Sequence, residues 1–220
     1  MRKFWFCMVL ALMALTPGVL ASGQTGVPNL DEQFLSAVEK GDMAAIADLL
    51  TKGAHVDTRG KGGYTGLIAS SAMGRTEVVD LLLKKGAKTD LVDDRGDTAL
   101  QYAVMTNNLE IARRLIAGGA NVNTAEKSGL TALMLSVVTS STEMMKLLLD
   151  NGAEIEVHDD AGFTPLMAAS GGGLVEKVKL LLDRGAKIDV KSNDGTTALL
   201  LAERQGKTEV VALLKERGAH

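Results

Sequence analysis

The dipeptide Gly-Ala recurs every 33 residues along this chain. Its six copies begin at Gly53, Gly86, Gly119, Gly152, Gly185 and Gly218. A threonine keeps the same period and occupies five positions, Thr65, Thr98, Thr131, Thr164 and Thr197. A fixed period of this length is typical of one supersecondary unit copied along a line, with each copy packed on its neighbours. The sequence therefore predicts a solenoid, a fold that usually works through an extended surface rather than through a catalytic pocket.

The composition is that of a folded protein with an aliphatic core. Hydrophobic residues make up 46% of the chain and charged residues 23%, as in ordinary globular proteins. Aromatic residues make up only 3%, so aliphatic side chains must form the core. The formal net charge of −3 gives no reason to expect nucleic acid or an anionic membrane as a partner.

Residues 1–21 differ from the rest of the chain and have the three parts of a secretory signal peptide. A basic pair comes first, residues 4–15 form an unbroken apolar run, and Val19 and Ala21 take the −3 and −1 positions of a cleavage site. We expect cleavage after Ala21, with cleavage before Gln24 as a second candidate. The alternative is a retained membrane anchor, but this run of 12 residues is short of the ~20 that span a bilayer.

The one cysteine of the chain, Cys7, lies inside this apolar run and does not follow a lipoprotein motif. After cleavage the chain has no thiol, which excludes a disulfide, a cysteine nucleophile and a thiolate metal site. These features predict export to the periplasm of a Gram-negative bacterium by a Sec-type signal, with secretion from the cell as the alternative. Residues 22–29 are expected to form a disordered leader.

One copy of the repeat, residues 91–123, illustrates the predicted unit. A glycine-containing turn precedes Thr98, which can cap a short first helix. Asn107 ends this helix, and apolar residues at helical spacing predict a second helix from Leu109 to Ala117. Residues 118–120, Gly-Gly-Ala, then end the second helix because glycine tolerates positive φ.

This pattern resembles the ankyrin repeat. The family's Thr-Pro-Leu-His-x-Ala signature is best matched by residues 164–169, Thr-Pro-Leu-Met-Ala-Ala. The resemblance covers residues 30–219 and implies an all-α solenoid of stacked helix-turn-helix units with short β-hairpin-like loops. The chain departs from the family at the signature histidine, whose place is taken by Ile68, Gln101, Met134, Met167 and Leu200. Apolar packing, or Gln101, is expected to replace the hydrogen bonds of that histidine.

The predicted organisation is a signal peptide at 1–21, a disordered leader at 22–29 and an ankyrin repeat domain at 30–220. Within this domain we expect an N-terminal capping repeat at 30–57, repeats at 58–90, 91–123, 124–156 and 157–189, and a C-terminal capping repeat at 190–220.

No catalytic, metal-binding or cofactor-binding constellation stands out in the sequence. The histidines, His55, His158 and His220, are predicted to be solvated; His55 and His158 lie about three repeats apart and cannot share a metal ion. A glutamate recurs once per repeat, at Glu77, Glu110, Glu143, Glu176 and Glu209. This spacing favours a charge in the first turn of each second helix over paired catalytic carboxylates. We therefore expect neither enzymatic activity nor a cofactor.

An ankyrin stack implies a concave face, built from hairpin tips and first helices, on which family members generally bind proteins. By register, the candidate partner-binding residues are Tyr64, Asp97, Tyr102, Met105, Leu130, Leu135 and Phe163. They include three of the four aromatic residues beyond position 21, which suggests an apolar patch on a solvent-facing groove. The expected charged rim is Lys61, Asp94, Arg95, Lys127 and Asp160. The alternative is that the fingertip residues pack on the neighbouring hairpin and stiffen the row.

The sequence as a whole predicts an exported, monomeric, non-catalytic module that docks a protein partner on its concave face. Small periplasmic ankyrin proteins have been linked to the support of envelope enzymes such as catalase. The resemblance therefore also implies stabilisation of an envelope enzyme. Two other interpretations stay open: a secreted effector that binds host proteins, and an enzyme whose site is not recognised.

Overall fold

The computed structural model describes residues 29–139 and 141–220, and in these ranges the chain folds into helices joined by short loops. The predicted all-α class is confirmed. The predicted signal peptide and residues 22–28 of the predicted leader lie outside the described residues. Among the described helices, none combines the length and the apolar character that crossing a membrane requires.

The chain divides at Ala120 into two compact units, each with three helix pairs. The first unit contains α2 (Leu30–Lys40), α3 (Met43–Thr51), the short 3-10 helix η1 (Lys61–Gly63), α4 (Gly66–Ala72), α5 (Thr76–Lys84), α6 (Ala99–Met105) and α7 (Leu109–Ala117). The second unit contains α8 (Ala132–Thr139), α9 (Thr142–Asp150), α10 (Pro165–Gly172), α11 (Val175–Asp183), α12 (Ala198–Arg204) and α13 (Thr208–Glu216).

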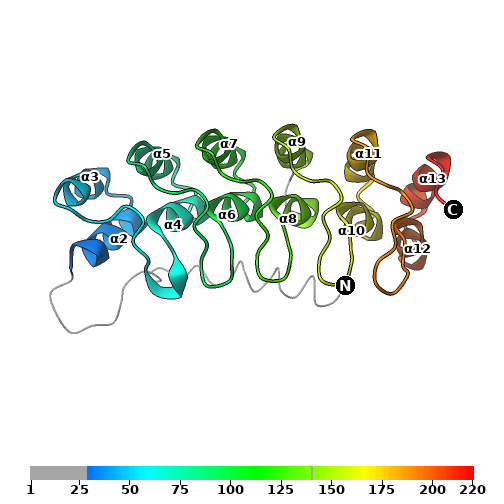
Figure 1. Cartoon of the computed structure of the whole chain (residues 1–220). Coiled ribbons are helices and arrows are strands. Elements are labelled where there is room, and N and C mark those ends of the chain that lie inside the picture. The colour runs from blue at the N-terminus through cyan, green and yellow to red at the C-terminus, as the bar shows by residue number, and fades with distance from the viewer. Residues whose placement is uncertain (1–28, 140) are drawn as a thin grey trace. The chain divides into compact units, whose positions relative to one another are not determined.

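Within each unit, the first helices of the pairs form one row and the second helices form another (Figure 1). In the first unit α4 contacts both α2 and α6, and α5 contacts α7. In the second unit α10 contacts both α8 and α12, and α11 contacts both α9 and α13. The loop before each first helix from α4 onward projects away from the row of second helices (Figure 1). We call these loops the fingers: residues 59–65, 92–98, 125–131, 158–164 and 191–197.

The periodic threonine caps the first helix of a pair. Thr65 has an extended backbone, and its side-chain oxygen accepts a hydrogen bond of 3.2 Å from the backbone N–H of Ile68. The same bond recurs at Thr98, Thr131, Thr164 and Thr197. A cap of this kind stabilises a helix by about 1 kcal/mol, which matters for first helices of two turns. The threonine period is therefore a property of local helix initiation.

The loop inside a helix pair turns through a residue in the left-handed conformation. Five such residues have positive φ: Gly41, Gly74, Asn107, Gly173 and Gly206. In each case the N–H of this residue bonds the carbonyl three residues back, and the next N–H bonds the carbonyl five residues back. At Gly74, for example, these acceptors are Ser71 and Ser70. This geometry satisfies carbonyls that the end of a helix leaves unpaired.

The core is aliphatic, as the composition predicts. The leucine two residues after each cap is buried, at Leu67, Leu100, Leu133, Leu166 and Leu199. A second buried row lies in the second helices, at Leu82, Leu115, Leu148, Leu181 and Leu214. The expected first helix pair is present as α2 and α3, with Phe34 and Ile46 fully buried. Each repeat thus buries its apolar side chains against its neighbours within a unit.

Candidate functional site

In the second and fourth fingers, an aspartate at the second position organises the backbone of a tight turn. In the second finger, Asp93 Oδ1 accepts hydrogen bonds of 2.9 Å from the backbone N–H groups of both Arg95 and Asp97. In the fourth finger, Asp159 Oδ1 accepts from Ala161 at 3.0 Å and from Phe163 at 2.8 Å. Antiparallel bridges close the first three fingers at Arg59–Thr65, Val92–Thr98 and Ala125–Thr131. The expected hairpin-like loops are therefore present.

Neighbouring fingers within a unit are bonded to each other. In the first unit the N–H of Asp94 donates to the carbonyl of Gly62 at 3.0 Å, and a Cβ on Gly63 would lie 2.8 Å from the Asp94 nitrogen. In the second unit the N–H of Asn193 donates to Ala161 at 3.0 Å. Glycine is thus required at position 63 by close approach of the next finger, and a backbone hydrogen bond joins the two fingers of each of these pairs.

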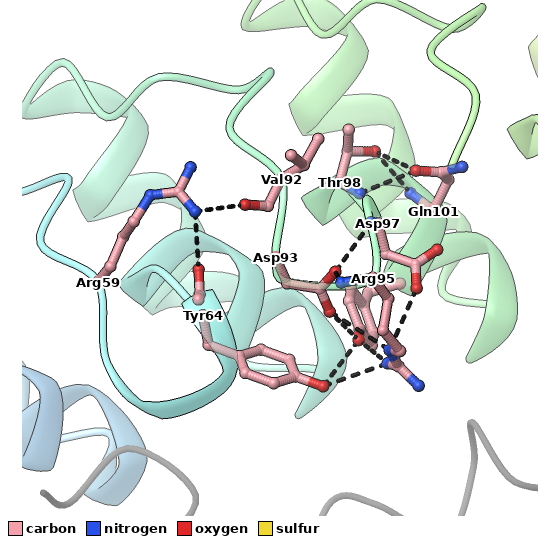
Figure 2. Close-up of polar contacts among 10 residues, drawn as sticks. Arg59, Tyr64, Val92, Asp93, Arg95, Asp97, Thr98 and Gln101 are labelled. Carbon is pink, nitrogen blue, oxygen red and sulfur yellow. Dashed lines mark hydrogen bonds and ion pairs between the residues drawn. The ribbon is translucent and has the colours of Figure 1, made fainter. Parts of the chain in front are cut away.

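Two tyrosines, one arginine and one aspartate form a compact polar cluster between the first two fingers (Figure 2). The hydroxyl of Tyr102, on α6, donates to Asp93 Oδ2 at 2.8 Å and lies 2.8 Å from the hydroxyl of Tyr64. Arg95 Nη2 donates to both hydroxyls, at 3.2 Å to Tyr64. Arg95 Nε lies 3.5 Å from a carboxylate oxygen of Asp93 and 3.5 Å from one of Asp97.

The electrostatics of the cluster keep Tyr102 protonated. Burial raises the pKa of its phenol, and the hydrogen bonds with Tyr64 and Asp93 raise it further, while the positive charge of Arg95 opposes this. A protonated phenol can donate to the Asp93 carboxylate, whose side chain is 1% exposed. Arg95 supplies the compensating positive charge, because a buried carboxylate is costly without a partner. The cluster is internally satisfied and joins two fingers to α6.

The cluster corrects the expectation of an open aromatic patch. Tyr64 is 7% exposed and Tyr102 is 1% exposed, so neither ring lies on a solvent-facing groove. Two other candidate partner-binding residues, Asp97 and Leu135, are each 7% exposed. The tyrosines are buried because their hydroxyls have partners on the neighbouring finger and their rings pack together with centroids 5.7 Å apart. This burial agrees with the alternative interpretation, in which fingertip residues stiffen the row.

Three candidate partner-binding residues stay partly exposed: Met105 in the first unit, and Leu130 and Phe163 in the second. Leu130 and Phe163 occupy the same fingertip position as Tyr64, directly before the capping threonine. Neither side chain has a hydroxyl that could bond a neighbouring finger as Tyr64 does. Of the expected rim, Lys61, Asp94, Lys127 and Asp160 are exposed, and the Arg95 side chain is 39% exposed.

The histidines are exposed, as predicted, and His55 lies beside one carboxylate, with Nδ1 3.2 Å from Asp31 Oδ2. Over residues 29–139 and 141–220, no three His, Cys, Asp or Glu side chains are grouped so that they could hold a metal ion. Each of the recurrent glutamates lies exposed in the first turn of a second helix. There a negative charge interacts favourably with the helix dipole.

Sequence reasoning also missed the buried lysine of α11, Lys177, which is 9% exposed. A comparison of the repeats could have identified this residue. The equivalent positions hold Val78, Ile111, Met144 and Val210, all buried. A lysine in a row of buried apolar residues requires hydrogen-bond partners, because an unpaired buried charge is strongly destabilising.

The chain belongs to the ankyrin-repeat family. A family model described as ankyrin repeats in three copies matches residues 34–126, 69–159, 105–192 and 141–220, which together cover nearly all of the described chain. The resemblance and the repeat solenoid inferred from the sequence are thereby confirmed. No curated protein matches the chain. Ankyrin repeats serve in general as protein–protein interaction modules and as non-catalytic scaffolds.

Proposed function

We propose that this chain is an exported, non-catalytic module that binds a protein partner through the fingers and first helices of its second unit. The observation that carries the proposal is the partial exposure of Leu130 and Phe163 at two fingertips. Both side chains are wholly apolar, so a partner that covers them gains roughly 25 cal/mol per Å² of apolar surface removed from water. Aromatic anchors in such positions commonly dominate binding energy.

The surroundings of these fingertips support the same proposal. Lys127 and Asp160 are exposed on the same two fingers. Ala168 on α10 is partly exposed, and its small side chain leaves room for a partner's side chain. An apolar centre with a charged edge is the usual arrangement of a protein–protein interface. In the first unit the polar cluster around Tyr102 instead favours a supporting role for the fingers.

The proposed export rests on the sequence of residues 1–21, with its basic pair, apolar run and small residues before the cleavage position. Expression of the full chain in a Gram-negative host, followed by mass measurement of the periplasmic protein, tests it. We expect a mature chain that begins at Ser22. Recovery of the uncleaved chain in the membrane fraction would instead support a retained anchor.

The binding surface is tested with a double variant, Leu130→Asp with Phe163→Asp. Tyr64 is left unchanged, because an aspartate there would disrupt the buried cluster and confuse misfolding with lost binding. The matched control is Leu200→Asp, which places the same charge on an exposed leucine of α12, 39% exposed. All variants are first compared with wild type by circular dichroism and thermal unfolding.

Affinity capture from the periplasmic fraction should recover a partner with wild type and with the control, but not with the double variant. A partner that also binds the folded double variant would show that these fingertips are not the binding surface. We further propose that the partner is an envelope protein, with an enzyme stabilised by the complex as the specific case. Detection of the protein in the medium, with binding to host proteins, would favour the secreted effector.

A further inference from the structure

The unusual lysine of α11 bonds the end of a helix in the preceding repeat. Lys177 Nζ donates to the backbone carbonyl of Ser136 at 2.9 Å, and also to that of Val137. Both carbonyls belong to the last turns of α8. A positive charge at the C-terminal end of a helix interacts favourably with its dipole, and hydrogen bonds from an ammonium are stronger than neutral ones.

The two acceptors occupy defined positions in the repeat. In the other five helix pairs, the equivalent carbonyls accept hydrogen bonds from the N–H of the left-handed residue and from the next N–H. For α6 these carbonyls are Val104 and Ala103, which bond the N–H groups of Asn107 and Asn108. The Lys177 ammonium therefore reaches the same two carbonyls that a helix-ending turn satisfies elsewhere in the chain.

The sequence of the α8–α9 pair differs from the other pairs at the position of this turn. The position of the left-handed turn holds glycine in four of the other pairs and Asn107 in the fifth, whereas the α8–α9 pair has Ser140 in the sequence. Asparagine and glycine adopt positive φ more readily than serine. The sequence of this pair thus lacks the residue type that favours the usual helix end.

The residue that normally covers such a loop from the next repeat is also changed. Arg75 Nη2 donates to the carbonyl of Glu39 near the end of α2, and the Lys207 side chain lies against Gly173. In the α10–α11 pair the residue at the equivalent position is Leu174, which has no side-chain donor. Lys177 lies three residues further along, so a donor is supplied from the next turn of the same helix.

We propose that Lys177 is a C-cap supplied by the neighbouring repeat, a latch that holds the end of α8 closed and links the α8–α9 pair to the α10–α11 pair. Burial lowers the pKa of its ammonium, which is the cost of placing the charge there. No carboxylate on the adjoining first helices offsets this cost, because α8 and α10 contain no ionisable residue. The ionisable residues of α9 and α11 other than Lys177 are exposed: Glu143, Lys146, Asp150, Glu176, Lys179 and Asp183.

The latch sets how readily this part of the second unit opens. When the carbonyls of Ser136 and Val137 lose the ammonium, the last turn of α8 should fray without unfolding of the rest of the unit. The predicted test is site-resolved amide hydrogen exchange on the full chain, comparing wild type with Lys177→Met. Methionine is chosen because Met144 fills the equivalent position one repeat earlier and is fully buried there.

We expect exchange of the amides of residues 136–139 to accelerate about 10-fold or more in Lys177→Met, as for loss of a hydrogen bond from a charged donor. Amides of α12 and α13 should change little. The control is Lys179→Met, which removes an exposed lysine, 47% exposed, from the same helix and should leave α8 unaffected. Unchanged or slower exchange at 136–139 in Lys177→Met would overturn the proposal.

A double-mutant cycle with Ser140→Gly tests the capping role itself. Glycine at position 140 supplies the residue type found at the other turns, so the α8 end should no longer depend on Lys177. In the Ser140→Gly background we expect Lys177→Met to accelerate exchange by no more than about 3-fold, as the two substitutions act on one contact. Equal acceleration in both backgrounds would show that Lys177 acts by a route other than capping.

Discussion

The Tyr102 hydroxyl offers the sharpest test of the reasoning about the fingers, through the substitution Tyr102→Phe. This hydroxyl donates to Asp93 Oδ2 at 2.8 Å, lies 2.8 Å from the Tyr64 hydroxyl and accepts a bond from Arg95. Its removal leaves Asp93 Oδ2 beside Arg95 Nε at 3.5 Å. Loss of a hydrogen bond to a buried charged group costs about 1.5–3 kcal/mol, so we expect a loss of about 2–3 kcal/mol for the first unit.

Tyr64→Phe is the matched control, because it removes a hydroxyl from the same cluster without taking a donor from a carboxylate. Its hydroxyl contacts the Tyr102 hydroxyl and accepts from Arg95 at 3.2 Å. We expect a loss of about 1 kcal/mol, because the bond between the hydroxyls is neutral and the Arg95 side chain, 39% exposed, can bond water instead. The double variant should lose less than the sum of the two, since the substitutions share the bond between the hydroxyls.

Urea denaturation followed by circular dichroism gives the free energy of unfolding, and hydrogen exchange of α4 and α6 amides assigns the loss to the first unit. A loss below about 0.5 kcal/mol for Tyr102→Phe would refute the argument, since that is the size of an ordinary surface substitution. Equal losses for the two single variants would also refute it. Either result would mean that the Asp93 carboxylate does not depend on the Tyr102 hydroxyl.

Three further outcomes follow from single sites. Gly162→Ala should cost about 2–3 kcal/mol, because at φ +81° its Cβ would lie 2.9 Å from a backbone nitrogen of the next finger. Gly152→Ala is the control, because Gly152 has φ +84° and no atom lies within 4 Å of the added Cβ. In urea denaturation it should lower the free energy of unfolding by only about 1 kcal/mol. Equal losses for the two variants would exclude a steric clash at position 162. Because burial lowers the pKa of Lys177 below 10.5, its desolvation penalty is present at neutral pH and diminishes as pH rises toward 10.5. Wild type should therefore gain stability relative to Lys177→Met as pH rises toward 10.5, and the opposite slope would contradict this. Hydrogen bonds from Ser192 and Thr196 lower the pKa of Asp194 to about 2. The stabilisation from its ionised form is therefore fully present above pH 3.8 and is lost as pH falls through about 2. Carboxyl chemical shifts should give that midpoint, and Ser192→Ala should move it toward 3.8.

Features that depend on neighbours in sequence could be predicted from the sequence. The second helix of the 91–123 copy was expected from Leu109 to Ala117, and α7 has these bounds. Thr98 caps α6 as predicted, and Asn107 takes positive φ where the first helix was expected to end. These features are determined within a few residues by capping, apolar spacing and backbone conformation. Repetition strengthens the prediction of these elements, because each copy of the repeat has the same local preferences.

The partners of individual side chains were decided by the tertiary structure. By register alone, Tyr64 and Tyr102 belong to the exposed edge of the repeat. In the structure their hydroxyls meet across 38 residues of sequence, and the Tyr102 hydroxyl bonds the Asp93 carboxylate, so both rings belong to a buried cluster. Lys177 likewise meets carbonyls 40 and 41 residues earlier in the chain. The 33-residue period predicts that neighbouring repeats pack together. It does not predict which of the side chains that differ between copies will pair where the repeats meet. The sequence by itself determined the repeated Gly-Ala architecture through local backbone preferences. The three-dimensional packing of non-identical copies decided which side chains are buried, such as Tyr102 and Lys177, and which stay partly exposed, such as Phe163.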